Sequence, residues 1–166
     1  MELRKSWRSL DLRAICTIVY VVALVIYLAV GLAPARAVDY EVATDMQVPA
    51  IGLVSDVTTI RRNGNQLDTP DTIVGRYAPM RHKTFLFGHA STVFAKLDEL
   101  VIGDEIIYDD TRYVVREMIV LAKEEIDMGE VLAEAEVETI VVMTCAGEDL
   151  GGGDATHRLI VTATVE

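Results

Sequence analysis

Cysteine is scarce in this chain, because only Cys16 and Cys145 occur among its 166 residues. Cys16 lies inside an apolar N-terminal run, so Cys145 is the single thiol in the rest of the chain and has no intramolecular disulfide partner there. A lone thiol of this kind forms an intermolecular disulfide, lies buried and inert, or is reactive. The cysteine count alone leaves these three alternatives open.

Basic residues are also in the minority. The chain has 15 Lys and Arg against 26 Asp and Glu, which gives a formal net charge of −11. Nucleic-acid binding is disfavoured, because neutralising phosphates requires basic patches. No group of cysteines and histidines has metal-ligand spacing, so the sequence predicts no metal and no cofactor. Internal repeats and low-complexity segments are absent too.

Charged residues are missing from one long stretch, residues 14–33, where 20 consecutive residues are uncharged. This length suits a helix that crosses a bilayer. The alternative is a cleaved signal peptide, since "APARA" follows, but the run exceeds the usual signal core of 7–15 residues. Basic residues precede it and acidic residues follow it, which places residues 1–13 in the cytoplasm. We expect a tether over 34–47 and an extracytoplasmic domain over 48–166.

Short β runs separated by turn signals dominate the rest of the chain. Strands are expected at 48–54, 83–91, 139–145 and 158–165, with two more inside 101–122 joined by a turn at Asp109-Asp110. The segment 56–67 is expected to be a strand that leads into a turn at Asn63-Gly64-Asn65. The other segments are expected to be an irregular connection at 68–80, a short helix at 91–100 and a loop with a helical turn at 123–138. The pattern has no βαβ alternation, so it predicts a mostly antiparallel, closed barrel or a sandwich.

One thiol, three histidines and one arginine could carry chemistry outside the apolar run. A thiolate nucleophile needs a proton-handling partner and a group that stabilises the developing oxyanion. His89 follows a glycine at the end of a β run, where an imidazole can stand clear of packed neighbours. His82 and His157 lie in polar or edge positions. Arg158 opens the last apolar run and carries a planar fork of donors.

Four motifs, "LFGHAS", "LDELVIGDEIIY", "VVMTC" and "RLIVTA", resemble the sortase family in order and content. Sortases are membrane-anchored cysteine transpeptidases of bacterial surfaces. Their signature strand ends in Thr-Leu-x-Thr-Cys. The match here is to Thr144 and Cys145, with Val141 and Val142 in place of the leading Thr-Leu. That departure lies in the body of the strand, where β-branched residues pack equally well.

The other motifs extend this resemblance over residues 48–166. The family's Gly-His pair matches Gly88-His89, and its arginine at the start of the final strand matches Arg158. "VPAIGL" is similar to the family's Ile-Pro-x-Ile-Gly first strand. The run "GRYAPMRHKTFLFGH" departs from the glycine- and asparagine-containing run of many sortases, so no subclass is assigned.

The resemblance implies an all-β fold, an eight-stranded closed barrel with one or two short helices. It also implies that Cys145 is the nucleophile, that His89 is the general acid and base, and that Arg158 stabilises the oxyanion and the substrate. Thr144 and Gly88 are expected to shape the substrate pocket. The segment 146–157 would be a long, mobile loop at the mouth of the groove, and the acidic segment 123–138 would occupy the place of a substrate-contacting loop.

The implied activity is that of a transpeptidase or peptidase at the bacterial cell membrane. Its substrates would be exported proteins with a C-terminal sorting motif, and the acceptor an amine from a cell-wall precursor or a pilin lysine. Two alternatives stay open. One is an L,D-transpeptidase, although "VVMTCAG" lacks the histidine that usually precedes the cysteine of those enzymes. The other is a catalytically inactive anchored barrel used for binding or assembly.

Overall fold

The structure, a computed structural model, describes residues 20–22, 42–62, 64 and 67–166. The chain divides into two units, Met1–Asp39 and Tyr40–Glu166, and the second carries the fold. The anchor expected over 14–33 lies outside the described residues, apart from the helical residues 20–22. Among the residues that are described, no helix has the length and apolar character needed to span a bilayer.

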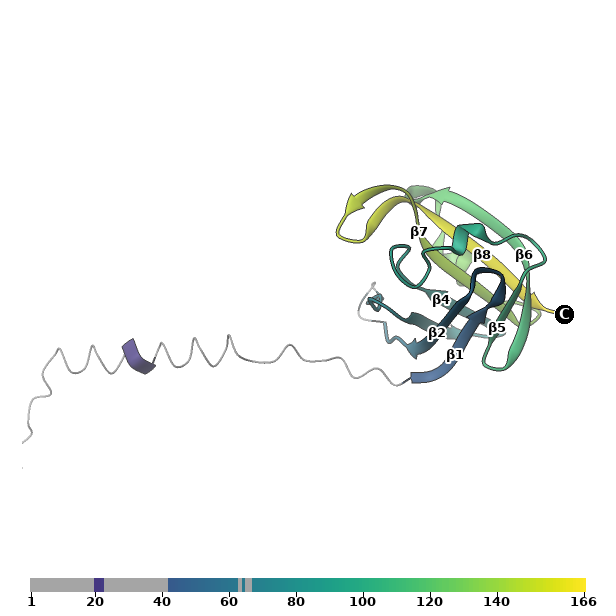
Figure 1. Ribbon diagram of the computed structural model, residues 1–166, viewed down its shortest axis with the longest axis horizontal. Helices are drawn as coiled ribbons and strands as arrows, with labels where there is room; N and C mark the ends of the chain where they lie inside the picture. Colours follow the sequence, from purple (N-terminus) through teal and green to yellow (C-terminus); the bar gives the residue numbers. More distant parts are fainter. Residues whose placement is uncertain (1–19, 23–41, 63, 65–66) are drawn as a thin grey trace, which may run out of the picture. The chain divides into compact units, whose positions relative to one another are not determined.

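Eight strands in the described part of the chain close into a barrel (Figure 1). They are β1 (Val42–Val48), β2 (Leu53–Thr59), β3 (Val74–Met80), β4 (Lys83–Phe87), β5 (Glu105–Tyr108), β6 (Thr111–Ala122), β7 (Thr139–Gly151) and β8 (Asp154–Val165). Their order around the barrel is β1-β2-β3-β4-β7-β8-β6-β5, and β5 returns to β1. Neighbours are antiparallel except β2–β3 and β4–β7. The prediction of a mostly antiparallel, eight-stranded closed barrel is therefore confirmed.

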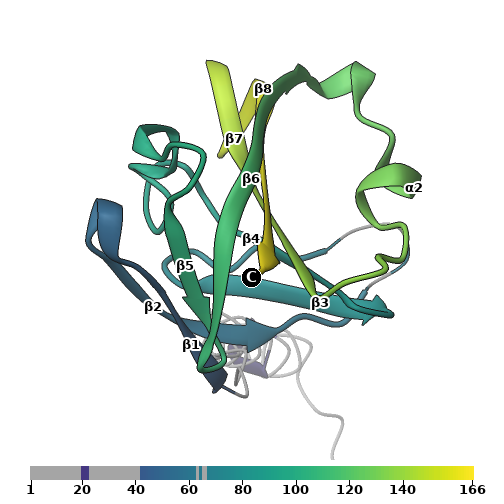
Figure 2. The ribbon, with the colours of Figure 1, turned by 90° about the vertical axis from the view of Figure 1, so that its right-hand side faces the viewer.

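Helical structure is limited to single turns. The described elements are the 3-10 helices η1 (Pro49–Ile51), η2 (Leu97–Glu99) and η3 (Lys123–Glu125) and the α-helix α2 (Met128–Val131). The expected helical turn within 123–138 is thus confirmed by η3 and α2. In Figure 2 the segment that carries α2 stands at one side of the barrel, away from β1 and β2.

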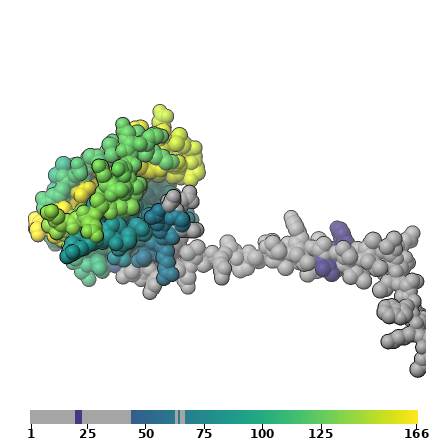
Figure 3. Space-filling model, turned by 180° about the vertical axis from the view of Figure 1, so that it is seen from behind, coloured from purple at the N-terminus to yellow at the C-terminus, as the bar shows by residue number. Residues whose placement is uncertain are grey.

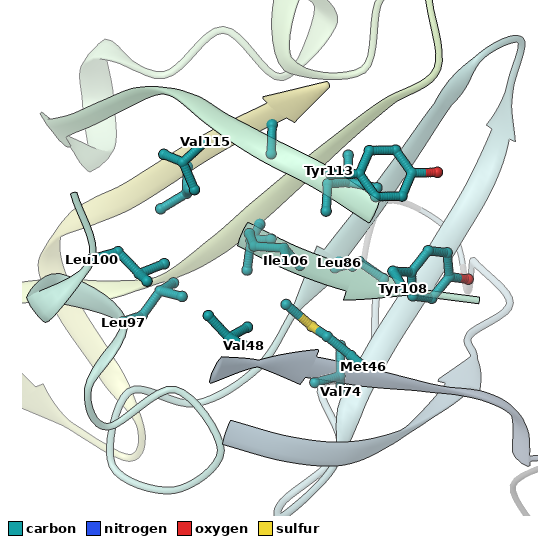
Figure 4. Close-up of a cluster of buried hydrophobic side chains, with 14 of the residues drawn as sticks. Met46, Val48, Val74, Leu86, Leu97, Leu100, Ile106, Tyr108, Tyr113 and Val115 are labelled. Atoms are coloured by element: carbon teal, nitrogen blue, oxygen red, sulfur yellow. The ribbon is translucent and has the colours of Figure 1, made fainter. Parts of the chain in front are cut away.

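Strand alternation divides the apolar side chains between two layers. One layer fills the barrel interior, where Met46, Leu86, Ile106 and Val115 are fully buried (Figure 4). The second lies on the outer face of β4, β7 and β8, and its buried members are Ile60, Phe85, Phe87, Val141 and Ile160. The β6–β7 segment covers this outer layer with partly buried Ile126, Val131 and Leu132, and Figure 3 shows the segment in green across that face. Cys145 lies four residues after Val141 on β7. Because side chains alternate between the two faces of a strand, Cys145 belongs to the same outer face.

The first strand expected at 48–54 is wrong, because residues 49–52 form the turn between β1 and β2 and only the two ends of the range lie in strands. Pro49 opens η1, and Gly52 ends it in the left-handed region with φ of 65°. A non-glycine residue is strained there, so the chain reverses at this point. Val42–Val48, largely within the expected tether, pairs with Leu53–Thr59 instead. The strand expected at 56–67 is shorter at its C-terminal end, since β2 ends at Thr59.

The irregular connection expected at 68–80 is also wrong, because Val74–Met80 form β3. Gly75 lies against the Phe87 ring, where an added Cβ would sit 2.8 Å from ring carbons, so the glycine allows close strand packing. Pro79 falls where the β3–β4 register breaks between Tyr77 and Met80, and a missing N–H is tolerated at such a break.

The helix expected at 91–100 is replaced by turns and the short η2. Successive hydrogen bonds there span three residues, for example from Leu97 N to Phe94 O and from Leu100 N to Leu97 O. Phe94, Leu97 and Leu100 are all buried. Their spacing of three matches the three residues per turn of a 3-10 helix rather than the 3.6 of an α-helix.

The long loop expected at 146–157 is wrong as well. β7 continues to Gly151 and β8 starts at Asp154, so the segment is a β-hairpin that projects from the barrel (Figure 1). Gly151, Gly152 and Gly153 all have positive φ and form its tight turn. The hairpin turn at Asp109-Asp110 is confirmed, and both residues have positive φ.

Candidate active site

Cys145 on β7 lies directly opposite Arg158 on β8. The next pair on the same face, two positions along, is Met143 and Ile160 of the outer apolar layer, so Cys145 and Arg158 belong to that face of the sheet. Cys145 is a partly exposed free thiol, while only 14% of the Arg158 side chain is exposed. The two residues thus lie side by side on neighbouring strands, although they are 13 positions apart in sequence.

Thr144 points to the other side of the sheet and ties β7 to the end of β4. Its side chain is 5% exposed, and its Oγ1 donates a hydrogen bond of 2.9 Å to the Gly88 carbonyl. Gly88 itself has no room for a side chain, because an added Cβ would lie 2.5 Å from Val93 Cγ1. This link holds the chain at Gly88 against β7, and His89 follows directly.

The hairpin turn brings Gly153 between Cys145 and His89. The Cys145 Sγ donates a hydrogen bond to the Gly153 carbonyl at 3.4 Å. A Cβ placed on Gly153 would lie 3.3 Å from His89 Cε1, so the turn packs against the imidazole. Cavities of about 320 and 300 Å³ are both lined by Cys145, His89 and Gly153. The second of them also includes Arg158, Thr144 and Gly88, so all five sequence-predicted site residues line one groove.

Acidic and carbonyl oxygens hold the Arg158 guanidinium. Its Nη2 donates to Asp154 Oδ1 at 2.6 Å, and its Nη1 donates to the carbonyls of Ala155 and His157, each at 2.9 Å. Asp154 also accepts a hydrogen bond of 2.5 Å from Lys123 Nζ. These donors, Lys123 first and Arg158 second, hold the pKa of Asp154 well below its usual range, so it is a carboxylate at any physiological pH.

The other two histidines do not face the thiol groove, although His157 pairs with Ala146 directly beside the Cys145–Arg158 pair. His82 adopts a φ of 54° in the β3–β4 turn, and its Nδ1 lies 2.5 Å from Glu138 Oε1. That turn meets the start of β7, since the Thr139 N–H donates to the His82 carbonyl, whereas Cys145 lies six residues further along β7. His157 is bonded to Thr156, with Oγ1 and Nδ1 2.7 Å apart. Neither histidine lines the two cavities beside Cys145.

Sequence reasoning missed Asp154, Lys123 and Gly153. Asp154 and Gly153 lie inside the segment expected to be a mobile loop, and Lys123 begins the acidic segment expected to be a substrate-contacting loop. A signal for Asp154 was present, because it stands four residues before Arg158. This spacing predicts a contact only if the segment is a strand or a turn, and not if it is a mobile loop. Within the described residues, no group of three or more His, Cys, Asp or Glu could hold a metal ion.

Comparisons with known proteins agree with this geometry. The family model described as the sortase domain matches residues 46–166, so the chain belongs to the sortase family, whose members are cysteine transpeptidases. No curated protein matches the chain. Because the match covers the barrel from Met46 onward and every residue of the groove, the family assignment rests on the folded unit.

Solved sortases of several classes share the fold. Sortase A of Listeria monocytogenes is 19% identical with a TM-score of 0.58, over 75% of this chain and 87% of that one. A lid mutant of sortase A from Corynebacterium diphtheriae is 21% identical with a TM-score of 0.60, over 81% of this chain and 75% of that one. Sortase C-1 of Actinomyces oris is 20% identical with a TM-score of 0.58, over 85% of this chain and 79% of that one. The similarity spans classes A and C at comparable scores, so it assigns no subclass.

Proposed function

We propose that this chain is a transpeptidase in which Cys145, His89 and Arg158 form the catalytic group. The Cys145 thiol gives its proton to His89, and the sulfur adds to the carbonyl carbon of the scissile peptide bond, so that a C–S bond forms and the carbonyl oxygen becomes an oxyanion. Collapse of this tetrahedral intermediate restores the carbonyl and breaks the C–N bond. His89 gives a proton to the leaving amine. An incoming amine then attacks the thioester, its proton passes to His89, a new C–N bond forms and the thiolate is released.

The observation that carries this proposal is the direct pairing of Cys145 with Arg158 across β7 and β8. A tetrahedral oxyanion formed at Cys145 would develop on the face that carries the guanidinium. Preorganised donors at such a position are the largest contribution to many acyl transfers. His89 lines both cavities beside the thiol, which supports its role in handling the proton.

The substrates follow from the family and the groove. We infer that they are exported proteins with a C-terminal sorting motif, and that the acceptor is an amine of a cell-wall precursor or a pilin lysine. The floor of the groove is apolar, formed by Phe85, Phe87 and Met143, with Met128 on its wall. Thr144 and Gly88 also line it, although the Thr144 hydroxyl is already bonded to the Gly88 carbonyl. We further propose that residues 14–33 anchor the chain in the bacterial membrane, with the barrel outside the cytoplasm.

A trapping experiment tests the activity whatever the sorting motif is. The full-length chain, purified in detergent, is incubated with a library of randomised hexapeptides and with hydroxylamine as the amine. Thioester formation and resolution would yield peptide hydroxamates, which mass spectrometry identifies by sequence. We expect hydroxamates from the wild type and none from Cys145→Ala. Equal yields from both proteins would contradict the proposal. So would the absence of hydroxamates from untreated wild type, when a separate portion of the same sample shows that iodoacetamide can alkylate Cys145.

A further inference from the structure

Asp154, the first residue of β8, lies between two cations. Its Oδ1 accepts hydrogen bonds from Arg158 Nη2 at 2.6 Å and from the Ala155 N–H at 3.0 Å, and its Oδ2 accepts one from Lys123 Nζ at 2.5 Å. We propose that Asp154 is a positioning residue for the transfer reaction, which fixes the Arg158 guanidinium beside Cys145 with Lys123 as its counter-charge. This inference rests on the function proposed above.

A count of donors shows what this arrangement leaves for a substrate. Arginine has five N–H donors in a rigid plane. Two on Nη1 are used by the carbonyls of Ala155 and His157, and one on Nη2 is used by Asp154. Within the residues that the structure describes, the Nε–H and one Nη2–H of Arg158 have no protein acceptor. Three contacts therefore orient the plane, and two donors remain for an oxyanion or a substrate carbonyl.

The three protein acceptors all belong to the start of β8. Ala155 and His157 contribute backbone oxygens, which cannot move without the strand, and Asp154 contributes the only side chain. A guanidinium held by backbone carbonyls on one nitrogen alone could still rotate about its own stem. The carboxylate on the second nitrogen removes that freedom. Pre-organisation of this kind reduces the conformational entropy lost when a substrate binds.

Charge balance explains the presence of Lys123. A carboxylate beside Arg158 by itself weakens the positive potential that the oxyanion requires. Lys123 restores it, because one anion and two cations sum to a single positive charge. Lys123 belongs to η3, directly after β6, so the network also joins β8 to the β6–β7 segment. Met128 of that segment lines the same groove, and Asp154 thereby couples the arginine to a wall of the groove.

The test compares variants of the full-length chain with hydroxylamine as the amine and the best-cleaved hexapeptide of the library as acyl donor. We expect Asp154→Ala to lower kcat about tenfold, less than the loss of a donor itself, with KM changed by less than about twofold. Asp154→Asn keeps one acceptor and should fall between wild type and Asp154→Ala. Lys123→Met should lower kcat by roughly threefold. Glu105→Gln is the matched control, because Glu105 pairs with Arg112 at 2.8 Å outside the groove, and it should behave as the wild type.

Two readouts separate positioning from a structural role. If Asp154 acts through Arg158, then adding Asp154→Ala to Arg158→Ala causes no further loss, because the two changes remove the same interaction. Iodoacetamide should still alkylate Cys145 in Asp154→Ala, which shows that the thiol stays accessible. Circular dichroism checks that each variant is folded. If Asp154→Ala does not fold, the same comparisons are made with Asp154→Asn.

Several outcomes would overturn the inference. They are an equal loss from Asp154→Ala in the Arg158→Ala background, a Cys145 thiol that iodoacetamide no longer alkylates in Asp154→Ala, or a kcat that is unchanged or raised. A raised kcat would mean that the carboxylate sequesters Arg158 rather than orienting it. Wild-type activity in Arg158→Ala would instead contradict the proposed role of Arg158, so the two failures are distinguishable.

Discussion

Replacing Thr144 by valine removes one buried hydrogen bond next to the nucleophile and leaves the side-chain volume nearly unchanged. The Thr144 side chain is 5% exposed, and its hydroxyl donates to the Gly88 carbonyl at 2.9 Å. Leaving a buried acceptor unpaired costs about 1–3 kcal/mol. For a domain of this size each kcal/mol lowers Tm by roughly 4 °C, so thermal unfolding of Thr144→Val should show a Tm lower by roughly 4–12 °C. Thr144→Ser keeps the hydroxyl, so its Tm should fall by less than that of Thr144→Val.

The same substitution should also reduce turnover, because the lost bond holds the residue before His89 against β7. A displacement of the order of 1 Å between reacting groups can cost up to about a hundredfold, and we expect kcat/KM on the selected hexapeptide to fall by roughly tenfold to a hundredfold. Thr139→Val is the matched control. Thr139 lies on the same strand, is 7% exposed, and donates an equivalent bond of 2.9 Å to the Val137 carbonyl at the far end.

Thr139→Val should therefore lose stability and keep its kcat/KM. If both valine variants lose turnover equally, the effect is general destabilisation, and the link from Thr144 to the position of His89 is refuted. A Thr144→Val protein with wild-type Tm would show that the hydroxyl contributes nothing to the fold.

Four further outcomes follow from the same geometry. Gly88→Ala should lower the free energy of unfolding by about 1–3 kcal/mol in urea denaturation, because its Cβ would lie 2.5 Å from Val93 Cγ1. His89→Ala should abolish hydroxamate formation while His82→Ala keeps it; the reverse would reject the assignment. Arg158→Ala should lose roughly 10²–10³ in kcat/KM, and Arg158→Lys should recover little, since lysine is a point charge; near wild-type activity in the lysine variant would contradict a bidentate role. Asp154 has a lowered pKa when folded, so its contribution to stability is present above about pH 4 and is lost as the pH falls further; the Tm difference between wild type and Asp154→Asn should shrink below that pH.

The sequence predicts the parts of the fold whose signals are local. The β-branched runs at the start of β7 and the end of β8, and the turn at Asp109-Asp110, are found where their patterns place them. Signals that depend on packing mislead. Pro79 and Gly75 indicate irregular structure, yet Gly75 lies in β3 because the Phe87 ring fills the space of a side chain. Likewise, buried Phe94 and Leu97 resemble one face of an α-helix, and the turn hydrogen bonds set a period of three instead.

In the candidate site too, residues within sequence motifs could be predicted and residues that act through packing could not. Cys145, His89 and Arg158 carry recognisable motifs, and the structure brings all three to one groove. The residues that hold them could not be predicted, because their contacts depend on where two distant segments meet. Lys123 and Asp154 are 31 positions apart and form an ion pair only because β6 and β8 are neighbours.

The pairing of Cys145 with Arg158 depends on register, which no motif specifies. Beyond this pair, β7 contributes residues 146–151 before the turn and β8 only residues 154–157 after it. The two extra residues on β7 are absorbed at the register shifts between Ala146 and Asp149 and between Asp149 and Gly151. A slip of one residue would send an entire strand's side chains to the opposite face.

Gly147 makes the first of these shifts possible. Its φ is 79°, and an added Cβ would lie 2.6 Å from both Thr156 Oγ1 and His157 Nδ1. The Thr156 hydroxyl accepts a hydrogen bond of 3.0 Å from the Glu148 N–H, which fixes the bulge across the hairpin. Glycine is therefore required at position 147 by both backbone conformation and space. The facing of thiol and guanidinium is consequently set by a bulge at the base of the hairpin, two residues from Cys145, as well as by the two residues themselves.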